Sequence, residues 1–331
     1  MFKYILKRLG YMVCVFLVLS AMMYFLYNLI PGDPVKAELD VYVKNNKNLT
    51  AEQIEAQRQF ITERLGLNYP LPVRYVKWLK GIVTGDFGYS NYFRKDVIDV
   101  IKAPMGNTIF INIFATIAAL AITIPLGIYC AVKRGSYFDN SVQVLTIVGY
   151  SIPSYIIALV FIYIFAVKLG WFPVSGMNSP GKTLEGFAWF KDRLWYMGLP
   201  LIVMTFASLG GMTRYVRTAM IDALRMDYIR TARAKGLKEK VVIYSHAWRN
   251  ALLPVITLII GWFLGIFGGS VIIENTFGLN GIGKTLYDAL MNSDYELVLA
   301  LQMFYVIIAL VGNLIIDLSY GLVDPRIRVN K

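Results

Sequence analysis

Uncharged stretches dominate the chain and are separated by shorter polar segments. Six of them reach the roughly 20 helical residues that cross about 30 Å of hydrocarbon. They cover residues 9–32, 103–132, 140–167, 194–213, 250–273 and 297–316. This pattern predicts an all-α membrane protein with six transmembrane helices. Four prolines inside the runs predict kinks or helix ends, which neighbouring helices tolerate: Pro125, Pro153, Pro200 and Pro254.

Composition agrees with a membrane protein. Hydrophobic residues make up 57% of the chain and charged residues 16%, against about a quarter charged in soluble domains. Both cysteines, Cys14 and Cys130, fall within apolar runs. They are therefore interpreted as small core residues and not as a disulfide framework.

The charges between the runs predict how the chain crosses the membrane. With the N-terminus inside, the inner segments carry 17 basic and 6 acidic residues, and the outer segments carry 16 and 15. The positive-inside rule therefore places both termini in the cytoplasm. It also explains the net charge of +12, so no nucleic-acid partner is expected. The inner segments are residues 1–8, 133–139, 214–249 and 317–331.

These segments divide the chain into three parts. Residues 1–32 form the cytoplasmic end and the first transmembrane helix, residues 33–102 an extracytoplasmic domain, and residues 103–331 a core with five spans. In the outer domain, "LTAEQIEAQRQFITERLG" predicts a helix. Thr50 and Gln53 fit a capping box, and Gly66 fits the helix stop.

The run "GLNGIGKT", from Gly278 to Thr285, matches the pattern of a nucleotide-binding P-loop. A working P-loop follows a strand, opens a helix and belongs to a soluble α/β domain. Here an apolar run precedes the motif, and Glu296, just before the next run, lies only eleven residues after Thr285. The predicted topology also places the motif outside, away from ATP. We therefore interpret it as a glycine-rich turn that covers or re-enters the outer membrane surface.

The inner loop 214–249 contains a second informative stretch, "DYIRTARAKGLKEKVVIYSHAWRN". Apolar residues at helical spacing predict one helix running through to Ala234 or Lys235, and Gly236 fits its stop. Such a helix could rest on anionic lipid headgroups or dock into a groove of a soluble partner. The residues alone leave both tasks open. The spaced residues are Ile221, Leu224, Tyr228 and Ala232, and the basic residues expected at the surface are Arg230, Arg233 and Lys235.

This stretch resembles the EAA loop of ABC importer permeases, through Ala232, Gly236 and the later pair Leu253-Pro254. It is most similar to the dipeptide/oligopeptide permease branch, and so are four segments elsewhere that extend the resemblance over nearly the whole chain. They are "HAWRNALLPVIT", "LIPGDP", "LGLNYPLPVRYVKWLKGIVTGDFGYS" and "ENTFGLNGIGKTLYDAL". The PGDP turn and the long outer domain resemble the B-type transmembrane subunit. One departure is that Arg230 stands where the EAA motif has its glutamate.

The resemblance implies a type I ABC importer permease fold in a bacterial plasma membrane, importing di- or oligopeptides. Expected partners are a homologous second permease, two ATPase subunits, an extracytoplasmic substrate-binding protein and membrane lipid. The chain itself is expected to bind no cofactor or metal and to have no catalytic residue, because ATP and Mg²⁺ would bind the ATPase subunits. The coupling helix that docks on an ATPase subunit would comprise Tyr228, Ile229, Arg230, Thr231, Ala232, Arg233, Ala234, Lys235 and Gly236.

Three other function classes were weighed. A proton-coupled transporter normally needs ionisable residues within the membrane, and the six runs contain none. An intramembrane hydrolase lacks a metal-binding pair or a base, since the only histidine, His246, lies in the inner loop. A channel without an ATPase stays open as an alternative. So does the same machinery with another cargo, such as nickel, a sugar or a modified peptide.

Neutral polar residues within the runs are candidates for a hydrated substrate path. Residues of this kind also form hydrogen bonds that hold neighbouring helices together, so both roles stay open. The residues proposed for the path are Asn112, Gln143, Ser151, Gln302 and Asn313.

Overall fold

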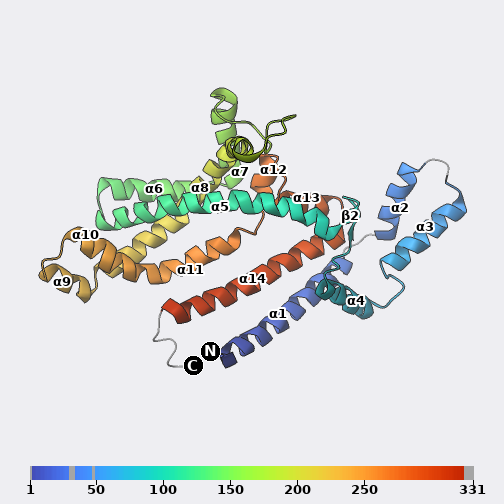
Figure 1. Ribbon diagram of the computed structural model, residues 1–331, viewed down its shortest axis with the longest axis horizontal. Coiled ribbons are helices and arrows are strands. Elements are labelled where there is room, and N and C mark those ends of the chain that lie inside the picture. Colours follow the sequence, from blue (N-terminus) through green and yellow to red (C-terminus); the bar gives the residue numbers. More distant parts are fainter. Residues whose placement is uncertain (1, 30–33, 47–48, 324–331) are drawn as a thin grey trace. The chain divides into compact units, whose positions relative to one another are not determined.

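The computed structural model describes residues 2–29, 34–46 and 49–323 and is almost entirely helical (Figure 1). Most of the PGDP turn and the end of the chain after residue 323 lie outside the described residues. The elements in the first half are α1 (Phe2–Leu29), α2 (Pro34–Asn45), α3 (Ala51–Arg64), α4 (Leu71–Thr84), β1 (Tyr89–Ser90), β2 (Lys95–Asp96), α5 (Val97–Val132), α6 (Tyr137–Ser151), α7 (Ser154–Phe161) and the π-helical η1 (Ile162–Lys168).

The second half contains two long helices, α8 (Gly186–Leu224) and α14 (Tyr295–Val323). Between them lie α9 (Asp227–Ala234), α10 (Glu239–Val241), the π-helical η2 (Val242–Trp248), α11 (Arg249–Gly265), α12 (Val271–Thr276) and α13 (Ile282–Met291). The chain forms two compact units, each described separately below. The first comprises residues 1–102 and 286–310, and the second comprises residues 103–285 and 311–331.

Five of the described helices are long and apolar enough to cross a membrane, or six if one bent pair counts as a single span. The expected first, second, fourth and sixth spans lie on α1, α5, α8 and α14. Pro125 and Pro200 lie inside α5 and α8 without ending them. The predicted number of spans therefore agrees with the helices observed.

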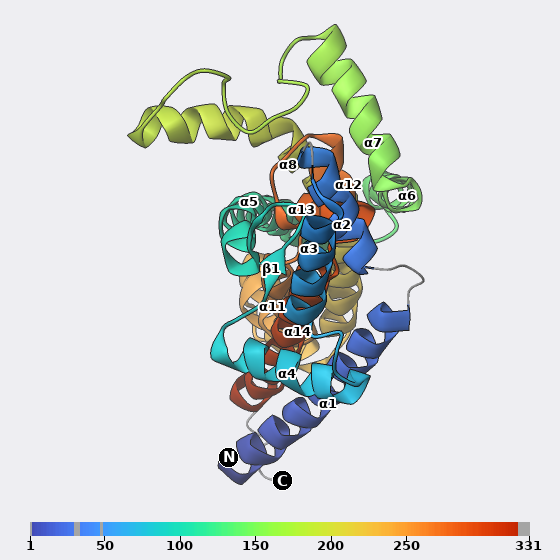
Figure 2. The same ribbon diagram turned by 90° about the vertical axis from the view of Figure 1, so that its right-hand side faces the viewer.

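The third expected span, residues 140–167, is not one helix. It consists of α6 and the α7–η1 helix, which bend by 101° at the break between Ser151 and Ser154 (Figure 2). Proline has no backbone N–H and disfavours helical geometry in the residue before it. Ile152, which precedes Pro153, is accordingly extended, with φ −83° and ψ 127°. The predicted effect of Pro153 on the helix is thus a complete break between α6 and α7.

The fifth expected span, residues 250–273, also differs in its ends. The helix over this region begins earlier, because η2 runs directly into α11, and it ends at Gly265. Residues 266–270, which include Gly268 and Gly269, leave the helix before α12 begins. Pro254 lies inside α11 and does not open it.

In the first unit, the capping box predicted for α3 is confirmed. Gln53 N–H donates to Thr50 Oγ1, and Thr50 N–H donates to Gln53 Oε1. The hairpin β1–β2 is fixed to the start of α14. Ser90 Oγ donates to Asp294 at 2.5 Å, and the N–H of Tyr89 donates to Glu296 at 2.7 Å.

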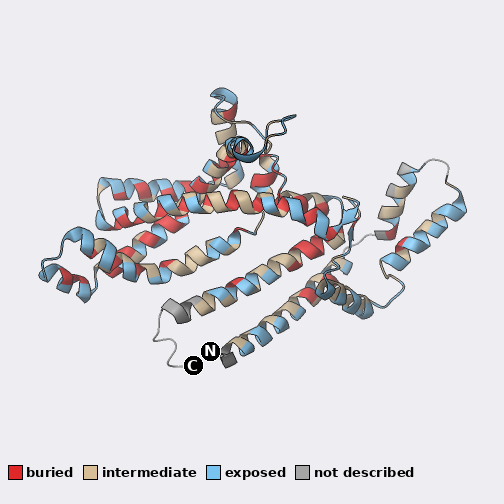
Figure 3. Cartoon of the chain, viewed as in Figure 1, coloured by how far each residue is buried: buried red, intermediate tan, exposed pale blue. Residues whose placement is uncertain are grey.

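Within the described residues, the second unit contains two buried apolar clusters, and Figure 3 shows buried positions interspersed with exposed ones along its long helices. One cluster joins α5, α8, α9, η2 and α11 around Met220 and Val242. The other joins α5, α7 and the start of α8 to Phe277 and Leu279. The two clusters hold in place α9, where most of the predicted coupling residues lie, and the segment between α11 and α13, which contains the start of the P-loop-like run.

Candidate coupling helix and outer loop

The predicted coupling residues Tyr228 to Ala234 lie on the separate short helix α9, and Lys235 and Gly236 follow it. The single helix expected from residue 221 to 234 or 235 is wrong, because α8 ends at Leu224 and Met226 is extended, with φ −71° and ψ 151°. The predicted stop is confirmed: Gly236 follows α9 with φ +74°, a left-handed conformation that favours glycine. The chain thus turns before and after α9, which makes it a distinct projection.

One face of α9 is buried against its own chain and the other is exposed. Ile229 is fully buried and Ala232 is 5% exposed, and both belong to the cluster around Met220 and Val242. The other seven predicted residues are exposed: Tyr228, Arg230, Thr231, Arg233, Ala234, Lys235 and Gly236. The helix is therefore anchored by two side chains and presents a mainly basic surface.

Charged contacts shape this surface. Arg233 donates two hydrogen bonds to Glu239, at 3.2 and 2.6 Å, and these raise the pKa of Arg233. Arg230 approaches Asp227 at 3.4 Å, with both side chains highly exposed. Such exposed pairs contribute about 0–1 kcal/mol. Arg230 can therefore exchange its partner for an external acidic group at little cost.

The P-loop-like segment surrounds a carboxylate that belongs to the chain itself. Glu274 on α12 accepts a hydrogen bond from the backbone N–H of Lys284 at 2.9 Å and from Thr108 Oγ1 at 2.8 Å. Glu274 is only 2% exposed. In a working P-loop, backbone N–H groups at the helix start receive phosphate oxygens. Here an internal carboxylate takes that role at the start of α13.

Opposing effects act on Glu274. Burial raises its pKa, whereas hydrogen bonds from Lys284, Thr108, Gly283 and Ser270 lower it, and the net result is a raised pKa. Glycine is required beside the carboxylate, because a Cβ on Gly281 would lie 2.4 Å from it. The segment is therefore built to pack against Glu274.

The five predicted path residues lie in different environments. Asn112 is 7% exposed and donates at 2.9 Å to the carbonyls of Ile266 and Gly268, so it holds backbone in place. The other four are only partly buried or exposed, and no hydrogen bond found among the described residues joins any two of the five. Gln143 and Gln302 are half-buried, and Ser151 and Asn313 are exposed.

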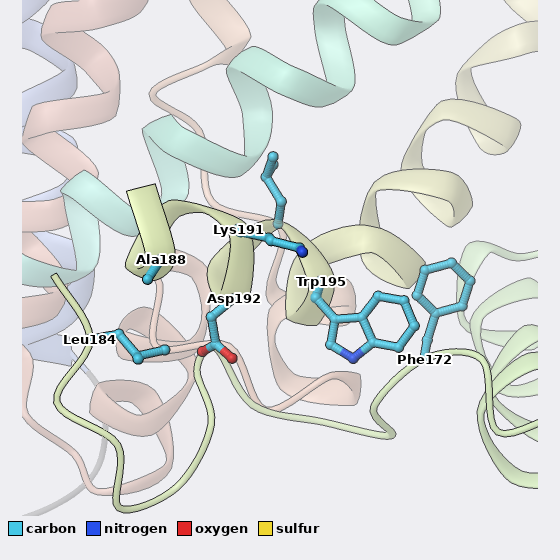
Figure 4. Close-up of a pocket in the computed structure, with 7 residues that line it drawn as sticks. Phe172, Leu184, Ala188, Lys191, Asp192 and Trp195 are labelled. Atoms are coloured by element: carbon cyan, nitrogen blue, oxygen red, sulfur yellow. The ribbon is translucent and has the colours of Figure 1, made fainter. Parts of the chain in front are cut away.

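A separate cavity of about 540 Å³ lies where the α7–α8 connection meets the start of α8 (Figure 4). The rings of Phe172 and Trp195 stack along it with centroids 5.3 Å apart. The carboxylate of Asp192 accepts two hydrogen bonds from Ser179, and Lys191 lies one residue before it. The lining is mainly apolar and includes none of the predicted site residues.

Sequence comparison identifies the protein family. Residues 123–329 match the family described as binding-protein-dependent transport system inner membrane component. Residues 1–110 match the N-terminal region described for such membrane components. The chain belongs to this family of ABC importer permeases. The permease is therefore an integral membrane protein that works with other ABC subunits and a substrate-binding protein.

Full-length relatives are similar throughout. The oligopeptide transport system permease AppB of Bacillus subtilis is 37% identical over 99% of both chains. The dipeptide transport system permease DppB of Escherichia coli is 34% identical over 100% of both chains. The di/tripeptide transport system permease DppB of Pseudomonas aeruginosa is 34% identical over 99% of both chains.

A solved structure of the methionine ABC transporter MetNI in an inward-facing conformation supports the fold. It matches 66% of the permease and 96% of the MetNI chain, with a TM-score of 0.50 and 17% identity. At this identity the match concerns the fold alone. The predicted fold class, an all-α membrane protein with the type I ABC importer permease fold, is confirmed.

Four charged residues are buried in the described part of the permease, and the sequence patterns did not predict their burial: Asp294, 2% exposed, and three that border the uncharged runs. Asp139 is fully buried, Arg193 is 6% exposed and Glu274 is 2% exposed. Each directly precedes or follows an uncharged run, so a search defined by absence of charge treated it as a boundary. Their position beside a long apolar run was the available signal, because charges there are bonded inside the protein or remain in water.

Proposed function

We propose that this permease is the B-type transmembrane subunit of an ATP-driven importer of di- or oligopeptides. The proposal of a peptide cargo rests on the three relatives above, which are named as peptide permeases and align over nearly their full length. We further propose that the protein lies in a bacterial plasma membrane with both termini in the cytoplasm. The positive-inside charge distribution supports this orientation.

The structure of α9 is the observation that carries the mechanism. A helix with two buried residues and six exposed ones is fixed on its own chain and offers a projecting surface. We propose that Tyr228, Arg230 and Lys235 on this surface enter a groove of an ATPase subunit. ATP binding by the ATPase pair would then move α9, and movement of α9 would shift the permease between inward-open and outward-open states.

The complete importer is proposed to contain this permease, a homologous second permease, two ATPase subunits and an extracytoplasmic binding protein. ATP and Mg²⁺ bind the ATPase subunits in this proposal, and the permease holds no catalytic residue of its own. No nucleic-acid partner is included. Substrate selection begins at the binding protein, which presents the peptide to the outer side of the permease.

We propose that the path for the peptide is lined by partly accessible polar side chains. These are Gln143, Ser151, Gln302 and Asn313. Among the described residues, the Nε2 atom of Gln143 has no hydrogen-bond partner, so in this proposal it bonds the substrate or water when the path opens. Asn112 contributes indirectly in this proposal, by fixing the backbone at Ile266 and Gly268.

Purification and uptake test the proposal together. The permease is tagged in its native host, isolated in mild detergent with whatever subunits remain bound, and reconstituted into vesicles with the binding protein. We expect ATP-dependent uptake of a labelled dipeptide, with competition by unlabelled di- and oligopeptides. Purification without an ATPase subunit would contradict the importer. Competition by nickel or sugars, but not by peptides, would instead contradict the cargo.

A further inference from the structure

Parts of the segment 266–284, which runs from the end of α11 through α12 into the start of α13, are buried although the segment is only partly helical. Phe277 and Leu279 are each 1% exposed, and Ile282 is fully buried. Connecting segments usually run over the surface, because buried backbone groups outside helices need other hydrogen-bond partners. The residues that supply these hydrogen-bond partners therefore hold the segment in place.

A single row of side chains on α5 supplies many of them. Asn107 Nδ2 donates to the carbonyl of Asn280 at 2.6 Å. Thr108 Oγ1 accepts from the N–H of Ile282 at 2.9 Å, and Asn112 donates to two carbonyls at the start of the segment. Thr108 and Asn112 lie on one side of the helix, since positions four apart are neighbours there, and Asn107 directly precedes Thr108. The segment is thus attached to α5 at its beginning and its end.

Glu274 is the charged member of this network. Its hydrogen bonds come from the hydroxyl of Thr108 and from backbone N–H groups, and no ion pair of Glu274 is found among the described residues. A buried carboxylate is costly unless its oxygens are well bonded. Glu274 therefore favours either a closed arrangement, in which all its hydrogen bonds are made, or an open one, in which water reaches its carboxylate. Intermediate positions are unfavourable.

Arg193 on α8 provides a buried positive charge that contacts the α5 side chains. Its guanidinium donates to Asn107 Oδ1 and lies 5.4 Å from the ring centre of Phe110 and 5.1 Å from that of Trp189. Its Nε is buried without a partner. Asn107 bonds Arg193 and Asn280, and the adjacent Thr108 bonds Glu274 and Ile282. Consecutive neutral side chains of α5 thus join two buried charges to one segment.

Glycines occur near both ends of the segment. Gly268 and Gly269 precede α12, and Gly281 and Gly283 lie beside the start of α13. A Cβ on Gly269 would lie 2.1 Å from the backbone nitrogen of Gly283, so the two ends touch through bare backbone. Few side chains therefore interlock at this contact. For the segment to move, the polar contacts with α5 and the packing of Phe277 and Leu279 in the apolar cluster with α5, α7 and α8 would have to break.

We propose that Glu274 is a positioning residue for import, which latches residues 269–284 to Thr108, and that this segment leaves α5 during each transport cycle. The inference rests on the proposed importer function, because only alternation between two states requires the movement. It assigns a role to the P-loop-like segment. The segment moves relative to α5, and the Glu274 carboxylate occupies the position where a P-loop would bind the anionic phosphate.

A reversible tether tests the movement. Asn107 and Asn280 are replaced by cysteine in a chain whose Cys14 and Cys130 are alanine, and the full complex is reconstituted. A short bifunctional methanethiosulfonate joins the two cysteines, and dithiothreitol releases them. We expect the tether to lower uptake of the labelled dipeptide at least tenfold and reduction to restore it. Full uptake by the tethered complex would overturn the proposal, and so would failure of the reagent to join the two positions.

Variants at Glu274 test its positioning role separately. Glu274→Ala removes the latch, so we expect more ATP hydrolysed per peptide imported, with ATPase subunits still bound. Glu274→Gln keeps the shape and one acceptor and should restore part of the coupling, including where the alanine variant assembles poorly. An unchanged ratio of ATP to peptide in both variants would refute the role. If the wild-type complex imports no peptide at all, the importer proposal fails instead.

Discussion

The guanidinium of Arg217 on α8 holds the carboxylate of Asp139 on α6 in a two-pronged contact. Its Nε and one terminal nitrogen each donate to a different carboxylate oxygen at 2.6 Å. The N–H of Gly135 adds a third hydrogen bond at 2.9 Å. Asp139 is fully buried, and the Arg217 side chain is 21% exposed. This pair joins α6 to the part of α8 that leads into α9.

Removing Arg217 should destabilise the permease strongly. In Arg217→Met the carboxylate of Asp139 stays buried without its partner, and breaking a buried pair in this way costs about 3–5 kcal/mol. Arg217→Lys should recover only part of the loss, because an ammonium cannot reproduce the two-pronged contact. Arg214→Met changes an exposed arginine on the same helix and is the control. Thermal unfolding of the purified complex measures the difference. Equal unfolding midpoints for Arg214→Met and Arg217→Met would contradict the role of Arg217 in holding Asp139.

Gly281 should tolerate no side chain. In Gly281→Ala the new Cβ would lie 2.4 Å from the Glu274 carboxylate, so either the segment or Glu274 must move. We expect a loss of about 1–3 kcal/mol, as for other overpacked sites, with reduced uptake. Gly106→Ala is the matched control, since no neighbour lies within 4 Å of its position on α5. Equal stability of the two variants would show that the close packing at Gly281 is absent in solution.

The raised pKa of Glu274 predicts a pH dependence of stability. The folded state binds this proton more tightly than the unfolded state, whose pKa is near the ordinary 4.5. The contribution of Glu274 is therefore fully present below about pH 4.5 and is lost as the pH rises through the raised pKa. Glu274→Gln cannot ionise and should not show this loss.

Unfolding midpoints of the two proteins measure this effect. From about pH 4.5 to 8, wild type should lose stability relative to Glu274→Gln as the pH increases. Other titrating groups are shared by both proteins, so they largely cancel in the comparison. A difference that stays constant with pH would show that Glu274 ionises normally. A difference of the opposite sign would show that its hydrogen bonds outweigh burial.

Sequence patterns predicted most helices well, because a helix in a membrane must be both long and uncharged. The capping box at Thr50 and Gln53 and the stop at Gly236 were also predictable, since each depends on residues close in sequence. The break at Pro153 was recognised as a proline effect, although its 101° bend was not predicted. Bend angles depend on the packing of both halves, which local sequence does not specify.

The functional residues were less predictable from the sequence than the helices. The exposed residues of α9 were named from the resemblance, whereas the turn at Met226 that separates α9 from α8 was not predicted. Asn112 was proposed for the path, but its amide is bonded to backbone just after the end of α11, at residues more than 150 positions away. The partners of Glu274 include Thr108, 166 positions away. Such contacts depend on how the helices pack together, which one sequence does not reveal.

The central claim is that a partner ATPase acts on this permease through α9. A photoreactive benzoylphenylalanine at Tyr228, which is 40% exposed, tests it in the purified complex. The same residue at Phe187, 79% exposed at the start of α8, is the control. We predict that irradiation cross-links position 228, but not position 187, to an ATPase subunit. An ATPase subunit that is present in the complex but never cross-links to position 228 would contradict the account.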